Sequence, residues 1–300
     1  MTVDLWAPLP PELEDAAGRV AEEIRRAAKQ PDNGQVRSAL RVGVAYSGGV
    51  DSSVLAALTA RAVGADSTVL LLAVSPSLAT RARHLAIEQA QLMGLPLREV
   101  TTREVEDPQY QENTHLRCYH CKSELFDRIS SEVTTQEKLD LVVVGTNASD
   151  LRAPDRPGQL SAAERGVLSP LASAGVTKAQ VRALAAALGL PSASLPASPC
   201  LASRIPHGTP VNAEILHAID QAEEVLVSEG FSTCRLRHHG EIARIEVPIE
   251  DLPRFADESV RERVIRGVRA AGFRYVTVDL AGLQSGAFTL QVLNQRQEVG

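Results

Sequence analysis

The stretch Arg41-Val-Gly-Val-Ala-Tyr46 is followed directly by Ser47-Gly48-Gly49-Val50-Asp51-Ser52-Ser53, and the two together carry the strongest sign of the fold class. The first six residues have the pattern of a buried strand, the next seven that of a turn, and Val54–Val63 that of a helix. Two glycines in such a turn let the backbone approach a phosphate closely, and the N–H groups that open the helix attract an anion. The spacing therefore predicts a phosphate-binding loop between a strand and a helix.

This loop matches neither of two better-known nucleotide motifs. The Gly-x-x-x-x-Gly-Lys-Ser/Thr pattern is missing, and with it the Walker lysine, while the absence of Gly-x-Gly-x-x-Gly weakens a dinucleotide dehydrogenase interpretation. The hydroxyls of Ser47, Ser52 and Ser53 add hydrogen-bond donors, and Asp51 is a candidate for holding Mg²⁺ against the phosphates. The plain structural alternative is a Gly-Gly turn with serine caps.

Around the loop, strand and helix patterns alternate. Further strands are expected at 68–74, 97–101 and 139–144, with Val167 and Leu168 as a short fifth strand, and helices at 12–29, 79–93 and 177–188. Strands that alternate with helices imply right-handed β-α-β units, and so a parallel α/β sheet covered on both faces.

The pattern changes after Gly189, where five prolines fall between Pro191 and Pro210. Beyond them we expect a helix at 213–229, strands at 234–238 and 242–247, a helix at 260–271 and a strand at 275–280. The division predicted is an N-terminal helical extension (1–36), a nucleotide-binding domain (37–190) and a smaller C-terminal α+β domain (191–300).

The amino-acid composition and net charge argue against several classes of function. Of 300 residues, 44% are hydrophobic and 23% charged, which is typical of a soluble globular protein. With 31 basic and 37 acidic residues the net charge is 31 − 37 = −6, which argues against nucleic acid as a partner. We find no signal-peptide pattern and no apolar run long enough for a membrane, and therefore expect a cytoplasmic protein with reduced thiols.

Four cysteines are too few for a disulfide scaffold in a chain of this length. Cys118 and Cys121 form a C-x-x-C pair that leads into a helix, for which metal binding, a redox dithiol and inert packing are the alternatives. Cys200 lies in the proline-rich stretch, and Cys234 lies in an expected strand, where a buried core thiol is the favoured interpretation.

The motif Ser-Gly-Gly-x-Asp-Ser resembles the PP-loop of the ATP pyrophosphatase superfamily, whose members share a Rossmann-like, adenine-nucleotide α-hydrolase fold and cleave ATP between its α and β phosphates. Beyond the loop, residues 118–126 and 196–210 resemble one family closely, the LarE family of ATP-dependent sulfur transferases. The resemblance runs from about residue 40 to 290. Its other motifs are Gly145-Thr-Asn-Ala-Ser-Asp150, Arg156-Pro-Gly158, Ser169-Pro-Leu171, Arg235-Leu-Arg237-His-His-Gly240 and Asp279-Leu-x-Gly282-x-x-Ser285-Gly286.

This resemblance implies a role in making the nickel-pincer nucleotide cofactor. Such proteins adenylylate a carboxylate of a pyridinium biscarboxylate mononucleotide with ATP and Mg²⁺, then replace its oxygen with sulfur, and they are often homo-oligomers. In one branch the sulfur comes from a cysteine that matches Cys200; in another, residues that match Cys118, Cys121 and Cys200 hold a [4Fe-4S] cluster that carries an extra sulfide. The sequence leaves both sulfur sources open. It also leaves open a zinc site in place of the cluster, with Cys234 or His120 as the fourth ligand.

The resemblance also assigns binding residues. ATP would contact Ser47, Gly48, Gly49, Asp51, Ser52, Ser53 and Asn147. Phosphate or substrate contacts are expected from Ser203, Arg204, Arg235 and Arg237, whose alternative is a solvated strand or loop charge. Glu223 is grouped with this substrate site as a residue that orients an arginine, and its alternative is an exposed helix charge. Val144 departs from the family pattern, because many relatives carry an acidic residue there. Two other functions stay open: a tRNA thiolation enzyme of the same superfamily, and a noncatalytic nucleotide-binding partner protein.

Overall fold

A four-stranded sheet forms the centre of the first compact unit. The computed structural model describes residues 3–28, 40–152, 157–196 and 199–283. Strand β1 (Val42–Tyr46) lies between β2 (Thr68–Val74) and β4 (Leu141–Val144), and β3 (Leu97–Thr101) pairs with β2. Every pairing is parallel, in the order β3-β2-β1-β4, which confirms the predicted parallel α/β sheet.

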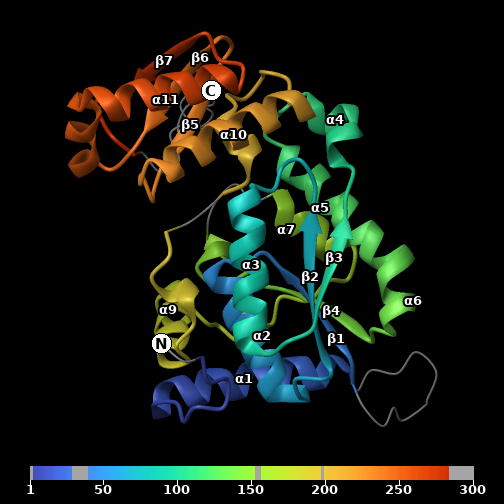
Figure 1. The fold of residues 1–300 in the computed structure, drawn as a ribbon. Helices are drawn as coiled ribbons and strands as arrows, with labels where there is room; N and C mark the ends of the chain where they lie inside the picture. Colours follow the sequence, from blue (N-terminus) through green and yellow to red (C-terminus); the bar gives the residue numbers. More distant parts are fainter. Residues whose placement is uncertain (1–2, 29–39, 153–156, 197–198, 284–300) are drawn as a thin grey trace. The chain divides into compact units, whose positions relative to one another are not determined.

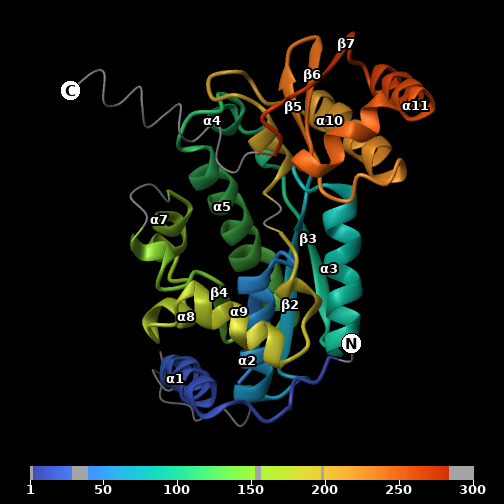
Figure 2. The same cartoon turned by 90° about the vertical axis from the view of Figure 1, so that its left-hand side faces the viewer.

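Helices cover both faces of this sheet (Figures 1 and 2). On one face, α2 (Val50–Val63) contacts β1 and packs against α1 (Pro11–Ala28) and α9 (Lys178–Ala187). On the other, α5 (Arg117–Arg128) and α7 (Pro157–Glu164) bury apolar side chains against the strands. That core includes Ala45, Val69, Leu71, Val100, Leu125, Phe126, Ile129 and Ala162.

Several expected boundaries differ from the structure by one or two residues, and two expectations differ by more, each for a local reason. Helix α2 begins at Val50 rather than Val54, because Gly49 in extended conformation caps it, so that Asp51, Ser52 and Ser53 belong to its first turn. The fifth strand is reduced to one parallel bridge between Leu168 and Val143. It ends there because Pro170, which has no N–H to donate, begins the short helix α8 (Pro170–Ser173).

The remaining helices of the first half are α3 (Thr80–Met93), the short α4 (Pro108–Gln111), and α6 (Thr134–Glu137), which continues α5 through a π-helical turn at Ile129–Val133. None of the described helices is long and apolar enough to cross a membrane.

The second compact unit has a sheet of three strands, β5 (Arg235–His239), β6 (Ile242–Glu246) and β7 (Tyr275–Val278). β5 and β6 are antiparallel, β6 and β7 are parallel, and α10 (Ala213–Ser228) and α11 (Glu258–Ala270) pack on them (Figure 1). This unit contains the residues from 199 onward together with two earlier segments, 76–81 and 105–117. The three-part division predicted at residues 36 and 190 stays a prediction.

Candidate active site: a phosphate loop and a braced cysteine

The loop between β1 and α2 has the geometry that phosphate binding requires. Gly48 has a φ of +73°, a left-handed conformation that suits glycine, and a Cβ there would lie 2.9 Å from Ala86 Cβ. The Ser52 hydroxyl donates to Gly49 O at 3.0 Å and accepts from Ser47 N–H at 3.2 Å, which tightens the turn. Ser53 is fully buried within α2. The loop thus leaves exposed glycine backbone at the N-terminus of a fourteen-residue helix.

Asp51 is the centre of a polar network at the carboxyl ends of β1 and β4. Its Oδ1 accepts from Asn147 Nδ2 at 2.9 Å, and its Oδ2 accepts from the Lys178 ammonium. Asn147 is completely buried and also donates to Asp150 Oδ2 at 2.7 Å. The structure therefore brings Asn147 to the phosphate loop, 96 residues away in sequence. Ligands of parallel α/β sheets bind at this edge.

Lys178 is a residue that sequence reasoning missed. It is the first residue of α9, behind a capping box formed by Thr177 and Gln180, and its backbone N–H donates to Ser149 Oγ at 3.1 Å. A cation at a helix N-terminus interacts unfavourably with the helix dipole. This unusual position is the sequence signal that could have identified Lys178 as a functional residue. Its ammonium group, paired with Asp51, places a positive charge beside a phosphate loop that has no Walker lysine.

The C-x-x-C pair lies on the first turn of α5. Cys118 is exposed and Cys121 partly buried, and a spacing of three residues places them on one face of the helix. Gly158 allows α7 to pack closely there, because a Cβ would lie 3.1 Å from Lys122 Cγ and 3.4 Å from Cys118 O. An exposed and a partly buried thiol one helical turn apart suit two ligands of a metal or cluster.

Cys200 lies in the second unit, immediately before a 3₁₀ turn at Leu201–Arg204, and its side chain is exposed. Buried arginines hold the carbonyls around it. Arg204 Nη1 donates to Pro199 O at 2.7 Å and to Cys200 O at 3.3 Å, and Arg237 Nη1 donates to Ser203 O at 3.0 Å. The loop is thereby fixed while the thiol points to solvent, as expected for a reactive cysteine.

Arg204 and Glu223 form a buried, two-pronged ion pair. Arg204 Nε and Nη2 lie 2.9 Å and 3.1 Å from the two Glu223 oxygens, and Glu223 also accepts the Leu236 N–H at 2.9 Å. Burial lowers the pKa of Arg204, but the Glu223 carboxylate outweighs it and raises that pKa overall. Glu223 is therefore not an exposed helix charge: it ties the cysteine loop to α10 and β5.

The strand arginines extend this cluster. Arg237 pairs with Glu246 at 2.9 Å, and Glu246 is fully buried at the end of β6. Sequence reasoning did not single out this glutamate. Burial, and then the charges of Arg204 and Arg237, lower the pKa of Arg235. Arg244 also pairs with Glu246, at 3.1 Å, and with Asp279. Four arginines against three acids leave one excess positive charge, which suits an anion such as phosphate.

The pKa values of Cys234 and His238 are shifted chiefly by burial. Burial raises the pKa of the Cys234 thiol to about 12, and its Sγ lies 4.0 Å from Glu223 O, which suits a packing thiol rather than a zinc ligand. Burial, and then His239, lower the pKa of His238. Within the described ranges, no three His, Cys, Asp or Glu side chains gather closely enough to hold a metal.

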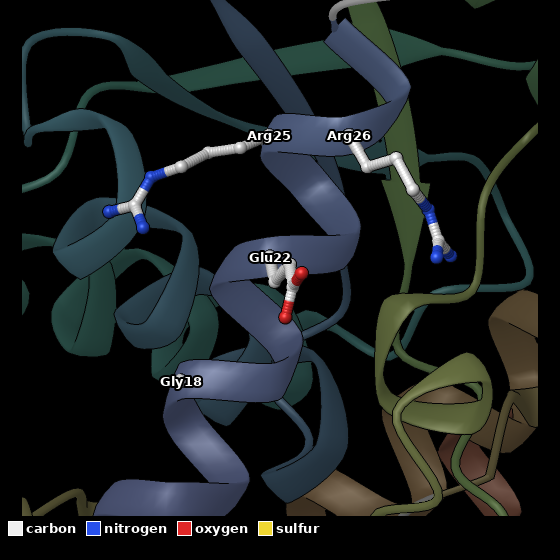
Figure 3. Close-up of a pocket in the computed structure, with 4 residues that line it drawn as sticks. All are labelled: Gly18, Glu22, Arg25 and Arg26. Atoms are coloured by element: carbon white, nitrogen blue, oxygen red, sulfur yellow. The ribbon is translucent and has the colours of Figure 1, made fainter.

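The pocket in Figure 3 is separate from these residues. It lies on α1 and is lined by Gly18, Glu22, Arg25 and Arg26, none of which is a predicted site residue. Arg25 is engaged with Ala62 O at 2.9 Å and Arg26 with Glu23 at 2.6 Å. Arg156, Ser285 and Gly286, which belong to the quoted motifs, lie outside the described residues.

Comparison with known proteins places this geometry in a family. The model of the NAD synthase family matches residues 33–209. An uncharacterized protein of Synechocystis is 39% identical over 246 residues, 82% of this chain and 91% of that protein. The pyridinium-3,5-bisthiocarboxylic acid mononucleotide synthase of Lactiplantibacillus plantarum is 33% identical, over 82% of this chain and 88% of the synthase.

A third relative, an uncharacterized protein of Methanocaldococcus jannaschii, is 29% identical over 80% of this chain and 89% of its own length. These similarities span both units, whereas the NAD synthase model ends at residue 209. The chain therefore belongs to the NAD synthase family of the PP-loop superfamily and, within it, to the LarE family.

Proposed function

We propose that this protein is an ATP-dependent, AMP- and pyrophosphate-forming sulfur transferase in the biosynthesis of the nickel-pincer nucleotide cofactor. Its substrate would be pyridinium biscarboxylate mononucleotide, the carboxylate counterpart of the bisthiocarboxylate named for the Lactiplantibacillus relative. The observation that carries the proposal is an exposed Cys200 on a loop held by buried arginines, in a chain that also has a PP-loop. A noncatalytic nucleotide-binding protein has no need of such a cysteine.

The proposed reaction has two steps. A carboxylate oxygen of the substrate attacks the α-phosphorus of ATP, the bond to the bridging oxygen breaks, and pyrophosphate leaves. A sulfur nucleophile then attacks the acyl carbon, and AMP departs with the electron pair of the former carbon–oxygen bond. Without the first step the leaving group would be oxide, which is far poorer than AMP.

ATP would bind at the loop of Ser47, Gly48, Gly49, Asp51, Ser52 and Ser53, with Asn147 orienting Asp51. Mg²⁺ would lie with the phosphates; the Asp51 carboxylate is the nearest candidate ligand, and Lys178 would turn from it toward the phosphates. The excess positive charge around Arg204, Arg235 and Arg237 would attract the phosphate of the mononucleotide.

Two sulfur sources fit this scheme. In the first, the Cys200 thiolate forms a thioester with the acyl group; loss of its Cα proton and cleavage of its Cβ–Sγ bond then leave a thiocarboxylate and dehydroalanine. In the second, Cys118, Cys121 and Cys200 would hold a [4Fe-4S] cluster, which would supply an exchangeable sulfide. Cys118 and Cys121, one turn apart on α5, suit two of its ligands.

The intact mass of the protein before and after turnover tests the proposal and separates the sources. A loss of about one H₂S mass at Cys200 is expected if the cysteine is the donor. An unchanged mass with repeated turnover, and a visible absorption band after anaerobic purification, is expected if a cluster carries the sulfide. Cys200→Ser should abolish sulfur transfer in either case, whereas Cys234→Ser should retain it; transfer by Cys200→Ser would overturn the proposal.

A further inference from the structure

We propose that Asn113 and Arg117 are positioning residues that hold the Cys200 loop in the geometry required for sulfur transfer. This inference rests on the function proposed above. The two residues lie in segment 105–117, which belongs to the same compact unit as Cys200 although more than 80 residues separate them in sequence. Neither was singled out by the sequence motifs.

Segment 105–117 is hydrogen-bonded to residues 206–211 of the loop that follows Cys200. Gly208 N–H donates to Asn113 O at 3.2 Å, and Val211 N–H donates to Gln111 O at 2.9 Å. His207 Nδ1 lies 3.1 Å from the same Asn113 carbonyl. The loop is therefore held by the backbone of an earlier segment rather than by its own turns alone.

The side chain of Asn113 serves as a double clamp. Its Nδ2 donates to Pro206 O and to Thr209 O, each at 2.8 Å, and the residue is completely buried. Its φ is +55°, the left-handed region that asparagine tolerates better than most residues other than glycine. A strained backbone that is buried and fully bonded points to a constraint on position.

Arg117 extends the clamp to the neighbourhood of the thiol. Its Nη1 donates to Ala202 O at 2.8 Å and also to Asn113 Oδ1, and the residue is only 6% exposed. Its guanidinium thus donates to two neutral oxygens, although burial of a charge is unfavourable. An apolar side chain would avoid the cost of burying a charge. The guanidinium therefore serves to fix the Ala202 carbonyl, two residues beyond Cys200.

Together these contacts fix the backbone on which Cys200 is carried. Leu201 N–H donates to Ser77 O at 2.9 Å, Arg117 holds Ala202, and Asn113 holds residues 206 and 209. Neither clamp residue belongs to the PP-loop. Loss of the clamp should therefore slow the attack of sulfur on the acyl carbon and spare adenylylation, because attack tolerates little misplacement.

The test compares Asn113→Asp, Asn113→Gly and Arg117→Gln with Arg261→Gln. In Asn113→Asp, a carboxylate oxygen replaces the Nδ2 donor and faces the carbonyls of Pro206 and Thr209. Asn113→Gly keeps the backbone conformation but removes the side chain that bonds to them. Arg261 is the matched control: an exposed arginine of the same unit whose Nη1 donates to Phe255 O and Ala256 O instead. ATP, Mg²⁺ and pyridinium biscarboxylate mononucleotide are supplied, and pyrophosphate release and thiocarboxylate formation are timed in a single turnover.

We expect the clamp variants to release pyrophosphate within about twofold of the wild-type rate and to transfer sulfur about 10- to 100-fold more slowly. Arg117→Lys, which keeps the charge and a donor, should recover part of the rate. Amide hydrogen exchange in residues 201–211 should accelerate in the clamp variants and not in Arg261→Gln. Wild-type sulfur transfer, or an equal loss of both steps, would overturn the positioning role.

Failure of the two proposals gives different results. A wild-type protein that makes no thiocarboxylate contradicts the proposed function, whereas hydrogen exchange reports on the clamp without any substrate. Unchanged exchange in residues 201–211 of Asn113→Gly would contradict the clamp even if the wild type were active. Asn113→Gly also guards against a variant that fails to fold, because glycine accepts a φ of +55° without strain.

Discussion

Arg204 is a buried arginine whose role depends on the direction of its guanidinium group. The motif predicted a phosphate contact. In the structure the guanidinium is committed to Glu223 on one side and to the carbonyls of Pro199 and Cys200 on the other. The sequence places an arginine four residues after Cys200, but the direction of its guanidinium depends on α10, which begins nine residues further along.

The first prediction concerns the Arg204–Glu223 pair, whose side chains are 4% and 11% exposed. Glu223→Gln leaves a buried guanidinium without its counter-charge, which should lower the free energy of unfolding by about 3 kcal/mol. Glu224→Gln, the exposed neighbour on the same helix, should change it by less than about 0.5 kcal/mol. Urea unfolding followed by circular dichroism measures both, and equal effects would contradict the structure.

The second prediction concerns Cys234. Because burial raises its thiol pKa to about 12, the thiolate is nearly absent at pH 8. Iodoacetamide should therefore modify Cys234 at least about 100-fold more slowly in the folded protein than in denaturant, where the pKa returns to about 8.5. Peptide mapping of the labelled protein gives the two rates. Comparable rates would mean that the thiol is accessible and ionised, and would reopen Cys234 as a metal ligand.

At the scale of elements, the sequence predicted the strand–loop–helix unit because all of its signals are local. The strands 68–74 and 97–101 were predicted residue for residue. The first is a short apolar run, and the second follows directly after the turn residues Gly94 and Pro96. The start of α2 was missed, because no local signal distinguishes a glycine in the loop from a glycine that caps a helix. Lys178 was missed because its partner, Asp51, is 127 residues away.

The two loop glycines give the third prediction. Gly48→Ala introduces a Cβ 2.9 Å from Ala86 Cβ at a left-handed φ, and should destabilise the protein by about 2 kcal/mol. Gly49 has a φ of −71°, and a Cβ there meets only Ser47 Oγ at 3.4 Å. Gly49→Ala should therefore keep wild-type stability and yet bind ATP about tenfold more weakly, because the new methyl occupies the phosphate's approach.

Thermal unfolding and ATP titration separate the two variants, and Gly49→Ala serves as the folding control for Gly48→Ala. If Gly49→Ala bound ATP as tightly as the wild type, the exposed backbone of this loop would not be the phosphate site. If Gly48→Ala were as stable as the wild type, the close approach of the loop to Ala86 would be wrong.

At the scale of the whole molecule, three separate segments of the chain make up the second unit. Segments 76–81 and 105–117 join residues from 199 onward, through contacts such as Asn113 with Pro206 that span 93 residues. The sequence marked a change of composition near residue 190, but it carries no local signal that a loop after β3 belongs to a later unit. The family motifs identified Cys200, Arg204 and Arg237, but the contacts by which these arginines, Asn113 and Arg117 hold the Cys200 loop emerged only from the structure.

The most direct test of the account is the stoichiometry of a single reaction mixture that contains the protein, ATP, Mg²⁺ and pyridinium biscarboxylate mononucleotide. We predict one AMP and one pyrophosphate for each sulfur inserted, with no release when the mononucleotide is omitted. Release of ADP, or AMP formation that the mononucleotide does not stimulate, would contradict the central claim that this chain activates a carboxylate for sulfur transfer.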